Sequence, residues 1–305
     1  MKTKNWNRLF NSSCNRIYLV DLASLRSYKK PSNFHQFLLI SIISFFILLL
    51  SYSSSSIAQE VVPTQIVSDE TTTAKTGSIN AITDPWKFLH NYQAKYSVLY
   101  DGSKVGNATR ELTKKDNHWT LATHAKLSKL FFKVKSKELA EFQIKDQQLL
   151  TERFFSETKR TFKKEKRMEQ VFNWEDKTEN GFNDKKQWQL ELKTPLFDRV
   201  SHVIQLRSDL IRGKKSFIYE ISYKGKRENY TYILEKKESI KTNMGELSSL
   251  KLVRKKSNGD IFVFWLSPEL NYLPIKIAQF EKDKADVVML LNSIDYIPNQ
   301  SEIAL

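Results

Sequence analysis

An alternation of apolar and polar residues dominates the sequence from residue 92 onward and constrains the fold more than any other feature. In the stretch 92–100 one set recurs at every second position: Tyr92, Ala94, Tyr96, Val98 and Tyr100. A period of two places such residues on one face of a strand, which is typical of a sheet buried on that face. Asp101-Gly102 follows at once and is a strong signal for a tight hairpin turn.

Further segments repeat this pattern and predict a sheet of about ten to twelve strands. They are 103–112, 118–127, 187–192, 215–225, 228–238, 248–256, 260–266, 272–282 and 285–297. Two turn signals, at 224–226 and at Asn258-Gly259, predict hairpins between neighbouring segments, and the last two segments form a further hairpin. We therefore expect a mainly β (α+β) fold: a long antiparallel meander in a single β-rich domain over 85–297, followed by a tail, 298–305.

One segment departs from the period of two and predicts a helix over 198–211. Apolar residues recur there at helical spacing: Val200, Val203, Ile204, Leu206 and Leu210. Asp198 or Ser201 can cap its start, and Gly213 can end it. The segment 127–139 fits a helix and a strand equally well, and 85–91 is a candidate for a short helix. The polar segment 174–188 is expected to be a loop, either the rim of a site or a plain hairpin connection.

The strand 261–266, IFVFWL, is apolar on both faces and must therefore be covered on both. The helix at 198–211 is the natural cover for one face. Phe264 and Trp265 should point to opposite faces, and a hydrophobic ligand would sit on the face that the helix does not fill. The expected ligand contacts are Trp265, Phe264, Phe262, Val203 and Leu206.

The N-terminal part has the pattern of a secretory signal. Residues 37–50 are apolar and uncharged apart from two serines, basic residues precede them, and a small-x-Ala site lies at 56–58. We expect residues 1–58 to be a signal peptide or an uncleaved inner-membrane anchor, and the rest of the chain to be exported. The Ser- and Thr-rich segment 59–84 predicts a flexible linker. The single cysteine, Cys14, precedes the apolar segment, so no disulfide is expected in the exported part.

The charge balance is strongly basic, with 49 Lys and Arg residues against 34 Asp and Glu residues. Without residues 1–58, 42 basic and 33 acidic residues remain, a net charge of +9. Such a surface suits an anionic lipid surface or a cell-wall polymer, or it is a soluble basic surface without a partner. Nucleic acid is not expected as a partner outside the cytoplasm. The basic run 159–167 is either a contact for an anionic partner or an edge strand whose lysines prevent pairing with other sheets.

Recognisable catalytic motifs are absent from the sequence. His118 and His124 share a strand face but lie six residues apart, about 20 Å along a strand, so neither a metal site nor a cofactor is expected. Asp198, His202 and Arg207 are the candidate residues for a hydrolase with a dispersed site. A cap or an ion pair explains Asp198 and Arg207 better, and we expect the protein not to be an enzyme.

Three passages occur in an order typical of a known family. They are DRVSHVIQLR at 198–207, TNMGELSSLKL at 242–252 and FWLSPELNYLPIKI at 264–277. With the start at 96–112 they resemble the bacterial domain-of-unknown-function family 3108. The matching residues are Asp198, Ser201, Leu206, Arg207, Thr242, Gly245, Trp265, Leu266, Pro268 and Pro274, and Glu269 stands where Asp is usual. The resemblance implies a secreted or periplasmic protein of Gram-negative bacteria with no established activity, and it supplies no catalytic residues.

The expected architecture is a sheet curled into a half-open barrel around one helix, similar to the periplasmic lipoprotein-carrier fold. By that analogy the first hypothesis is a monomeric, non-enzymatic carrier with an apolar cavity for a lipid or another hydrophobic ligand. The second is an envelope assembly or structural factor that binds a protein or the cell wall. The hydrolase with a dispersed site is the third.

Overall fold

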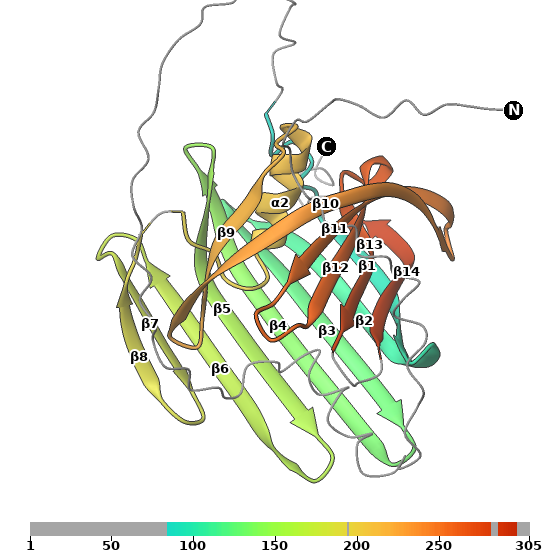
Figure 1. Ribbon diagram of the computed structural model, residues 1–305. Coiled ribbons are helices and arrows are strands. Elements are labelled where there is room, and N and C mark those ends of the chain that lie inside the picture. The colour runs from blue at the N-terminus through green and yellow to red at the C-terminus, as the bar shows by residue number, and fades with distance from the viewer. Residues whose placement is uncertain (1–83, 194, 282–285, 298–305) are drawn as a thin grey trace, which may run out of the picture. The chain divides into compact units, whose positions relative to one another are not determined.

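The computed structural model describes residues 84–193, 195–281 and 286–297 (Figure 1). The expected signal segment 1–58, nearly all of the linker 59–84 and the tail 298–305 lie outside the described residues. Within the described ranges, no helix combines the length and the apolar character that a membrane crossing requires.

In the described part of the chain fourteen strands form one sheet, more than the ten to twelve that the sequence predicted. The strands are β1 (Tyr92–Tyr100), β2 (Ser103–Lys115), β3 (His118–Lys129), β4 (Phe132–Lys145), β5 (Gln148–Arg160), β6 (Lys163–Asn173), β7 (Thr178–Asn183), β8 (Gln187–Glu191), β9 (Phe217–Tyr223), β10 (Lys226–Thr242), β11 (Gly245–Lys255), β12 (Ile261–Ser267), β13 (Leu273–Phe280) and β14 (Val287–Tyr296).

The sheet consists of two meanders joined by the pairing of β1 with β14. One meander runs from β1 to β8 and the other from β14 back to β9, so β8 and β9 are the two edges. All strand pairs in the sheet are antiparallel, which confirms the mainly β meander. The expected hairpins β9–β10, β11–β12 and β13–β14 are all present.

The structure decides one segment that the sequence left open and corrects the predictions for two others. The ambiguous segment 127–139 is the end of β3, a turn and the start of β4, so it is strand on both sides of the turn. The expected loop 174–188 contains β7, because its polar residues pair with β6 instead of facing solvent as a loop. The basic run 159–167 is not an edge strand, because it joins β5 to β6 inside the sheet.

The helix α2 (His202–Ile211) begins later than the predicted start at residue 198. Asp198 Oδ1 accepts the N–H groups of Val200 (2.6 Å) and Ser201 (2.9 Å), which holds a tight turn before the first helical residue. The helix ends just before Gly213, whose φ of 71° suits the residue after a helix. The segment 85–91 forms only a turn, in which the Leu89 N–H donates to the Trp86 carbonyl, so the short helix was wrongly predicted.

The helix and the inner face of the sheet enclose the main hydrophobic core, and a second, smaller cluster among the described residues consists of Phe172, Leu192 and Leu196. Among the fully buried members of the main core are Tyr96, Phe142, Phe154, Phe217, Leu206 and Leu252. His202 on α2 and the hydroxyl of Tyr232 on β10 lie 2.8 Å apart in a hydrogen bond within this core. In Figure 1 the helix lies at one end of the sheet, beside β9 and β10.

The two edges of the sheet meet through side chains. The buried carboxylate of Glu179 on β7 accepts hydrogen bonds from Gln170 (2.8 Å), Trp188 (3.0 Å) and Ser222 (2.6 Å), and from Arg227 on β10. Arg227 also donates to the carbonyl of Glu191 at the end of β8. One carboxylate thus links β6, β7 and β8 to β9 and β10, which no backbone pairing joins.

Candidate functional site

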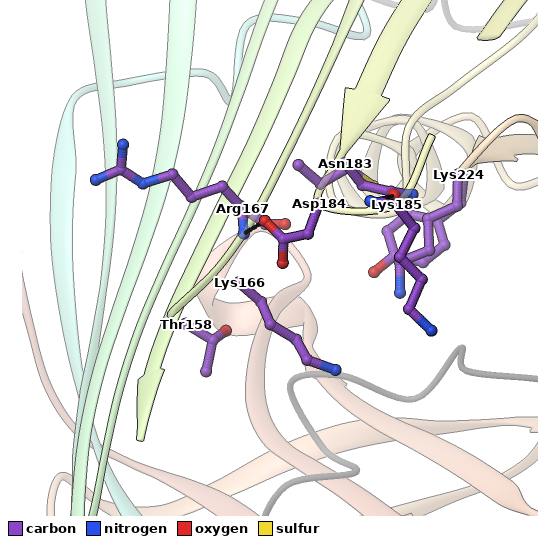
Figure 2. A pocket seen from close by; sticks show the side chains of 10 residues that line it. Thr158, Lys166, Arg167, Asn183, Asp184, Lys185 and Lys224 are labelled. Carbon is purple, nitrogen blue, oxygen red and sulfur yellow. Dashed lines mark hydrogen bonds between the residues drawn. The ribbon is translucent and has the colours of Figure 1, made fainter. Parts of the chain in front are cut away.

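A basic pocket lies between the two edge regions, near the ends of β5, β6 and β9 (Figure 2). It is lined by Ser156, Thr158, Lys166, Arg167, Met168, Asn183, Asp184, Lys185, Tyr223 and Lys224. The pocket has a volume of about 70 Å³ and is open to solvent, which is room for a few water molecules or a small anionic group. Eight of its ten lining residues are polar or charged, with Met168 and Tyr223 as the exceptions, although the surface that these residues present to the pocket is more apolar than polar.

Three hairpins bring these residues together from separate parts of the chain. Lys166 follows the β5–β6 turn, Lys185 lies in the β7–β8 turn, and Lys224 lies in the β9–β10 turn. Figure 2 shows these three lysines around the opening. Because Lys224 (φ 54°) and Gly225 (φ 71°) both take left-handed conformations, their two-residue turn is tight, which fixes where Lys224 leaves the sheet.

The pocket lysines lie close enough together to lower each other's pKa. Burial and the nearby cations Arg199, Lys166 and Lys185 lower the pKa of Lys224 to about 8. Burial, Arg160 and Lys185 also lower the pKa of Lys166 below its ordinary value. Crowded ammonium groups with depressed pKa values favour the binding of an anion, which restores their charged form.

Arg160 adds a guanidinium to this cluster. Burial lowers the pKa of Arg160. Its Nε and Nη2 atoms are buried and have no hydrogen-bond partner among the described residues. Buried N–H groups of this kind are costly unless an acceptor satisfies them.

The acidic contribution to the pocket is small. Asp184 Oδ1 accepts a hydrogen bond from the Arg167 backbone N–H at 3.3 Å, so this carboxylate helps to shape the β7–β8 turn. The guanidinium of Arg167 forms ion pairs with Glu157 and Glu165. The charges that face the opening are therefore mainly those of Lys166, Lys185 and Lys224 (Figure 2).

The pocket floor continues into a buried polar layer. Arg199 donates to the Tyr223 hydroxyl (3.3 Å) and lies 3.5 Å from Glu138, whose strand neighbour Ser156 lines the pocket. Burial raises the pKa of Tyr223, so this hydroxyl stays protonated. Hydroxyl groups and ammonium groups together can hold a phosphate or a carboxylate.

The residues expected to contact a hydrophobic ligand lie elsewhere in the molecule. Phe264, Val203 and Leu206 are buried in the hydrophobic core, and Phe262 packs against its edge. Trp265 points to the opposite face from Phe264, as predicted: it pairs with Lys251 and Lys276, whereas Phe264 pairs with Leu252 and Ile277. On that face the Trp265 Nε1 donates to Glu238 at 2.6 Å. Ligand contact by these five residues stays a prediction.

The helix and hairpin motifs form a structural joint. Arg207 on α2 donates to the carbonyl of Asn271 at 3.0 Å, directly after the short 3₁₀ turn Pro268–Leu270. Its guanidinium also lies 4.5 Å above the ring of Phe88. Ser201 shares a hydrogen bond of 3.0 Å with Thr151 on β5. These contacts position α2 against the two halves of the sheet.

The other motif residues shape turns and strand starts. Thr242 accepts the N–H of Met244 and donates to the carbonyl of Gly245, whose φ of 104° suits glycine. Pro274 is the second residue of β13, and its carbonyl accepts a hydrogen bond from the buried Tyr96 hydroxyl at 2.8 Å. The motif sequence is thus explained by the fold.

In a comparison with known families, residues 91–292 match the family described as "Protein of unknown function (DUF3108)". The chain belongs to the DUF3108 family. This confirms the resemblance that the three motif passages indicated. The match covers the described sheet almost from end to end, so the basic pocket lies within the DUF3108 domain.

The solved structures include a match titled "Crystal Structure of Beta-barrel-like Protein of Domain of Unknown Function DUF1849 from Brucella abortus". It is 15% identical in sequence, with a TM-score of 0.49, and the match covers 69% of this chain and 99% of that chain. A comparison with curated proteins gives no significant match.

The three candidate hydrolase residues of this DUF3108 domain occupy the joint rather than the pocket. Burial raises the pKa of Asp198 to about 6, although its Oδ1 holds the turn before α2. Burial and the nearby Arg254 lower the pKa of His202 to about 3, which leaves the imidazole neutral. His118 pairs with Glu152 at 2.8 Å. No group of three or more metal-ligating side chains occurs within the described parts of the chain.

Little in the amino-acid sequence indicated the pocket. Its lysines come from three hairpins and are 19 to 58 residues apart along the chain, and the meeting of the two sheet edges brings them together. The basic run 159–167 was the one available signal, because it contains Arg160 and Lys166. Lys185 lay in a segment predicted to be a polar loop, and Lys224 was interpreted only as part of a turn.

Proposed function

We propose that this DUF3108 domain is a non-enzymatic binding or carrier module for an anionic ligand with an apolar part, such as a lipid. The observation that carries this proposal is the basic pocket, where Lys166, Lys185 and Lys224 surround one opening. The pKa values of Lys166 and Lys224 are lowered there, so a phosphate or carboxylate would stabilise their charged forms.

The remaining sequence features support a carrier of the cell envelope. Residues 37–50 have the pattern of a secretory signal, which agrees with export to the periplasm. The long antiparallel sheet with one covering helix agrees with a half-open barrel that resembles the periplasmic lipoprotein carriers. That resemblance is an analogy of fold, so the ligand must be found by experiment.

Native mass spectrometry of the full chain, extracted from membranes in mild detergent, tests the proposal. We expect a bound anionic lipid on the wild type and its loss from a Lys166→Gln/Lys185→Gln double variant. The matched control is Lys237→Gln/Lys241→Gln, which removes the same charge from exposed positions on β10 and should retain the ligand. Absence of any bound anionic molecule from the wild type, or equal retention in both variants, would overturn the proposal.

A further inference from the structure

Two neighbouring hairpin tips expose large apolar side chains to solvent. The β3–β4 turn consists of Leu130 and Phe131, which are 78% and 64% exposed. The β5–β6 turn carries Phe162, which is 82% exposed. These are among the most exposed large apolar residues of the described chain, and they gather at one end of the sheet. We name them together the apolar tip.

Hydrogen bonds fix the two turns side by side. The Thr161 N–H donates to the Lys133 carbonyl at 3.1 Å, and the Lys133 N–H donates to the Thr161 hydroxyl at 2.9 Å. In Figure 1 these two hairpins reach out from the end of the sheet away from α2. The apolar tip is therefore one surface, built from residues about 30 positions apart in sequence.

Two of the large side chains of the apolar tip occupy backbone positions that normally favour glycine or asparagine. Leu130 has a φ of 54° and Phe162 a φ of 59°, in the left-handed region that bulky side chains disfavour. Other hairpins of the same sheet use Asp101-Gly102 or Lys224-Gly225 at such positions. Glycine or asparagine would fit these turns with less backbone strain. Strain of this kind is typically retained at functional positions, which indicates a role for the two apolar side chains.

Positive charge surrounds the apolar tip. The segment 129–135 contains three lysines, and the segment 159–164 contains three lysines and one arginine, with no acidic residue in either. Lys133, Lys163 and Lys164 are exposed beside the apolar side chains. A lysine next to inserted apolar groups can extend its ammonium to the level of lipid phosphates.

We propose that the apolar tip is a docking surface for a lipid bilayer with anionic headgroups. Leu130, Phe131 and Phe162 enter the interface between headgroups and acyl chains, and the flanking lysines contact the phosphates. Thr158 and Lys166, which line the basic pocket, lie on the same two strands, so docking brings the pocket opening close to the headgroups. The docking proposal stands whether or not the pocket holds a ligand.

A spin label at residue 131 tests the docking directly in the full chain. The label is introduced as Phe131→Cys in a Cys14→Ser background, and the control label as Ile218→Cys, because Ile218 on β9 is also exposed, at 60%. The probe is a vesicle of phosphatidylcholine with about one third phosphatidylglycerol. A local label separates docking of the apolar tip from any insertion of residues 37–50.

We expect the label at residue 131 to gain oxygen accessibility on these vesicles and the label at residue 218 to gain none. A Leu130→Asn/Phe162→Asn variant should lose this immersion without a lower unfolding temperature, because asparagine relieves the left-handed strain. No immersion, equal immersion at residue 218, or a large loss of stability in the variant would overturn the proposal. So would a label that becomes immobilised with rising protein concentration without vesicles, which would indicate a second copy as the partner.

Discussion

Glu179 is the residue on which the meeting of the two sheet edges depends most. Its buried carboxylate accepts from Gln170, Trp188, Ser222 and Arg227. A buried charged group of this kind is costly to leave without its partner. Removal of the Glu179 carboxylate should therefore destabilise the fold.

We expect Glu179→Ala to lower the free energy of unfolding by about 3–5 kcal/mol, because Arg227 and three other donors lose their acceptor. Urea denaturation measures the change. Glu191→Ala on the adjacent strand is the control, since its side chain is 70% exposed and should cost less than about 0.5 kcal/mol. Similar losses in both variants would show that the carboxylate of Glu179 does not hold the edges together.

The buried His202 should make the free energy of unfolding depend on pH. Burial and Arg254 lower its pKa to about 3 in the folded state, whereas the unfolded residue titrates near its ordinary value of 6.5. Below pH 6.5 the unfolded chain therefore binds a proton that the folded chain does not, and this residue's contribution to stability is lost as the pH falls toward 3. Asp198 acts in the opposite direction, because its raised pKa of about 6 favours the folded state as the pH falls below 6.

A His202→Gln variant isolates the histidine contribution. We expect the stability of the wild type, relative to this variant, to fall by on the order of 3 kcal/mol between pH 7 and pH 4. Chemical denaturation across this pH range provides the measurement. A difference between the two proteins that stays constant with pH would contradict the neutral, buried state of His202.

At the scale of elements, the β9–β10 turn is constrained from two sides. Gly225 has a φ of 71°, and a Cβ there would lie 2.8 Å from the Trp188 ring. Gly102 in the β1–β2 turn has a similar φ of 73° with nothing within 4 Å. Both glycines therefore need a positive φ, but only Gly225 has a side chain packed against the position of a Cβ atom.

Gly225→Ala should therefore lower the unfolding free energy more than Gly102→Ala, by about 1–3 kcal/mol, because it adds an overpacking cost to the same backbone strain. Thermal and urea unfolding of both variants give the comparison. Equal losses would mean that Trp188 can move away from the turn without cost.

Elements with a clear local signal were predictable from the sequence. Period-two alternation located β1, and Asn258-Gly259 located the β11–β12 hairpin. The segment 174–188 was not predicted correctly, because β7 has polar residues that satisfy a buried network instead of a hydrophobic face. The helix start was displaced because Asp198 caps a turn rather than the helix itself.

At the scale of the whole molecule, the pocket exists only because the ends of a fourteen-stranded sheet come together. Lys166 and Lys224 belong to opposite ends of the strand order, and no local pattern in the sequence relates them. The predicted hydrophobic site rested on a local pattern, the doubly apolar strand 261–266. Its Phe264 packs into the core, whereas the basic pocket lies where the two edge regions of the sheet meet.

The pocket also predicts that anion binding depends on pH. Lys224 has a pKa of about 8 in the free protein, and a bound anion should raise it, so binding takes up protons near that pH. We expect affinity to fall as the pH rises from 7 to 9. Calorimetry in two buffers with different ionisation enthalpies detects the proton uptake, and an affinity that is constant over this range would argue against a role for Lys224.

The most direct test of the basic pocket is equilibrium binding of a short-chain phosphatidylglycerol to the full-length protein. The wild type and the Lys237→Gln/Lys241→Gln control should bind with equal affinity. The Lys166→Gln/Lys185→Gln variant should bind at least about tenfold more weakly, because two of the charges that face the opening are removed. Equal affinity of all three proteins for this lipid would contradict the assignment of the pocket as an anion-binding site.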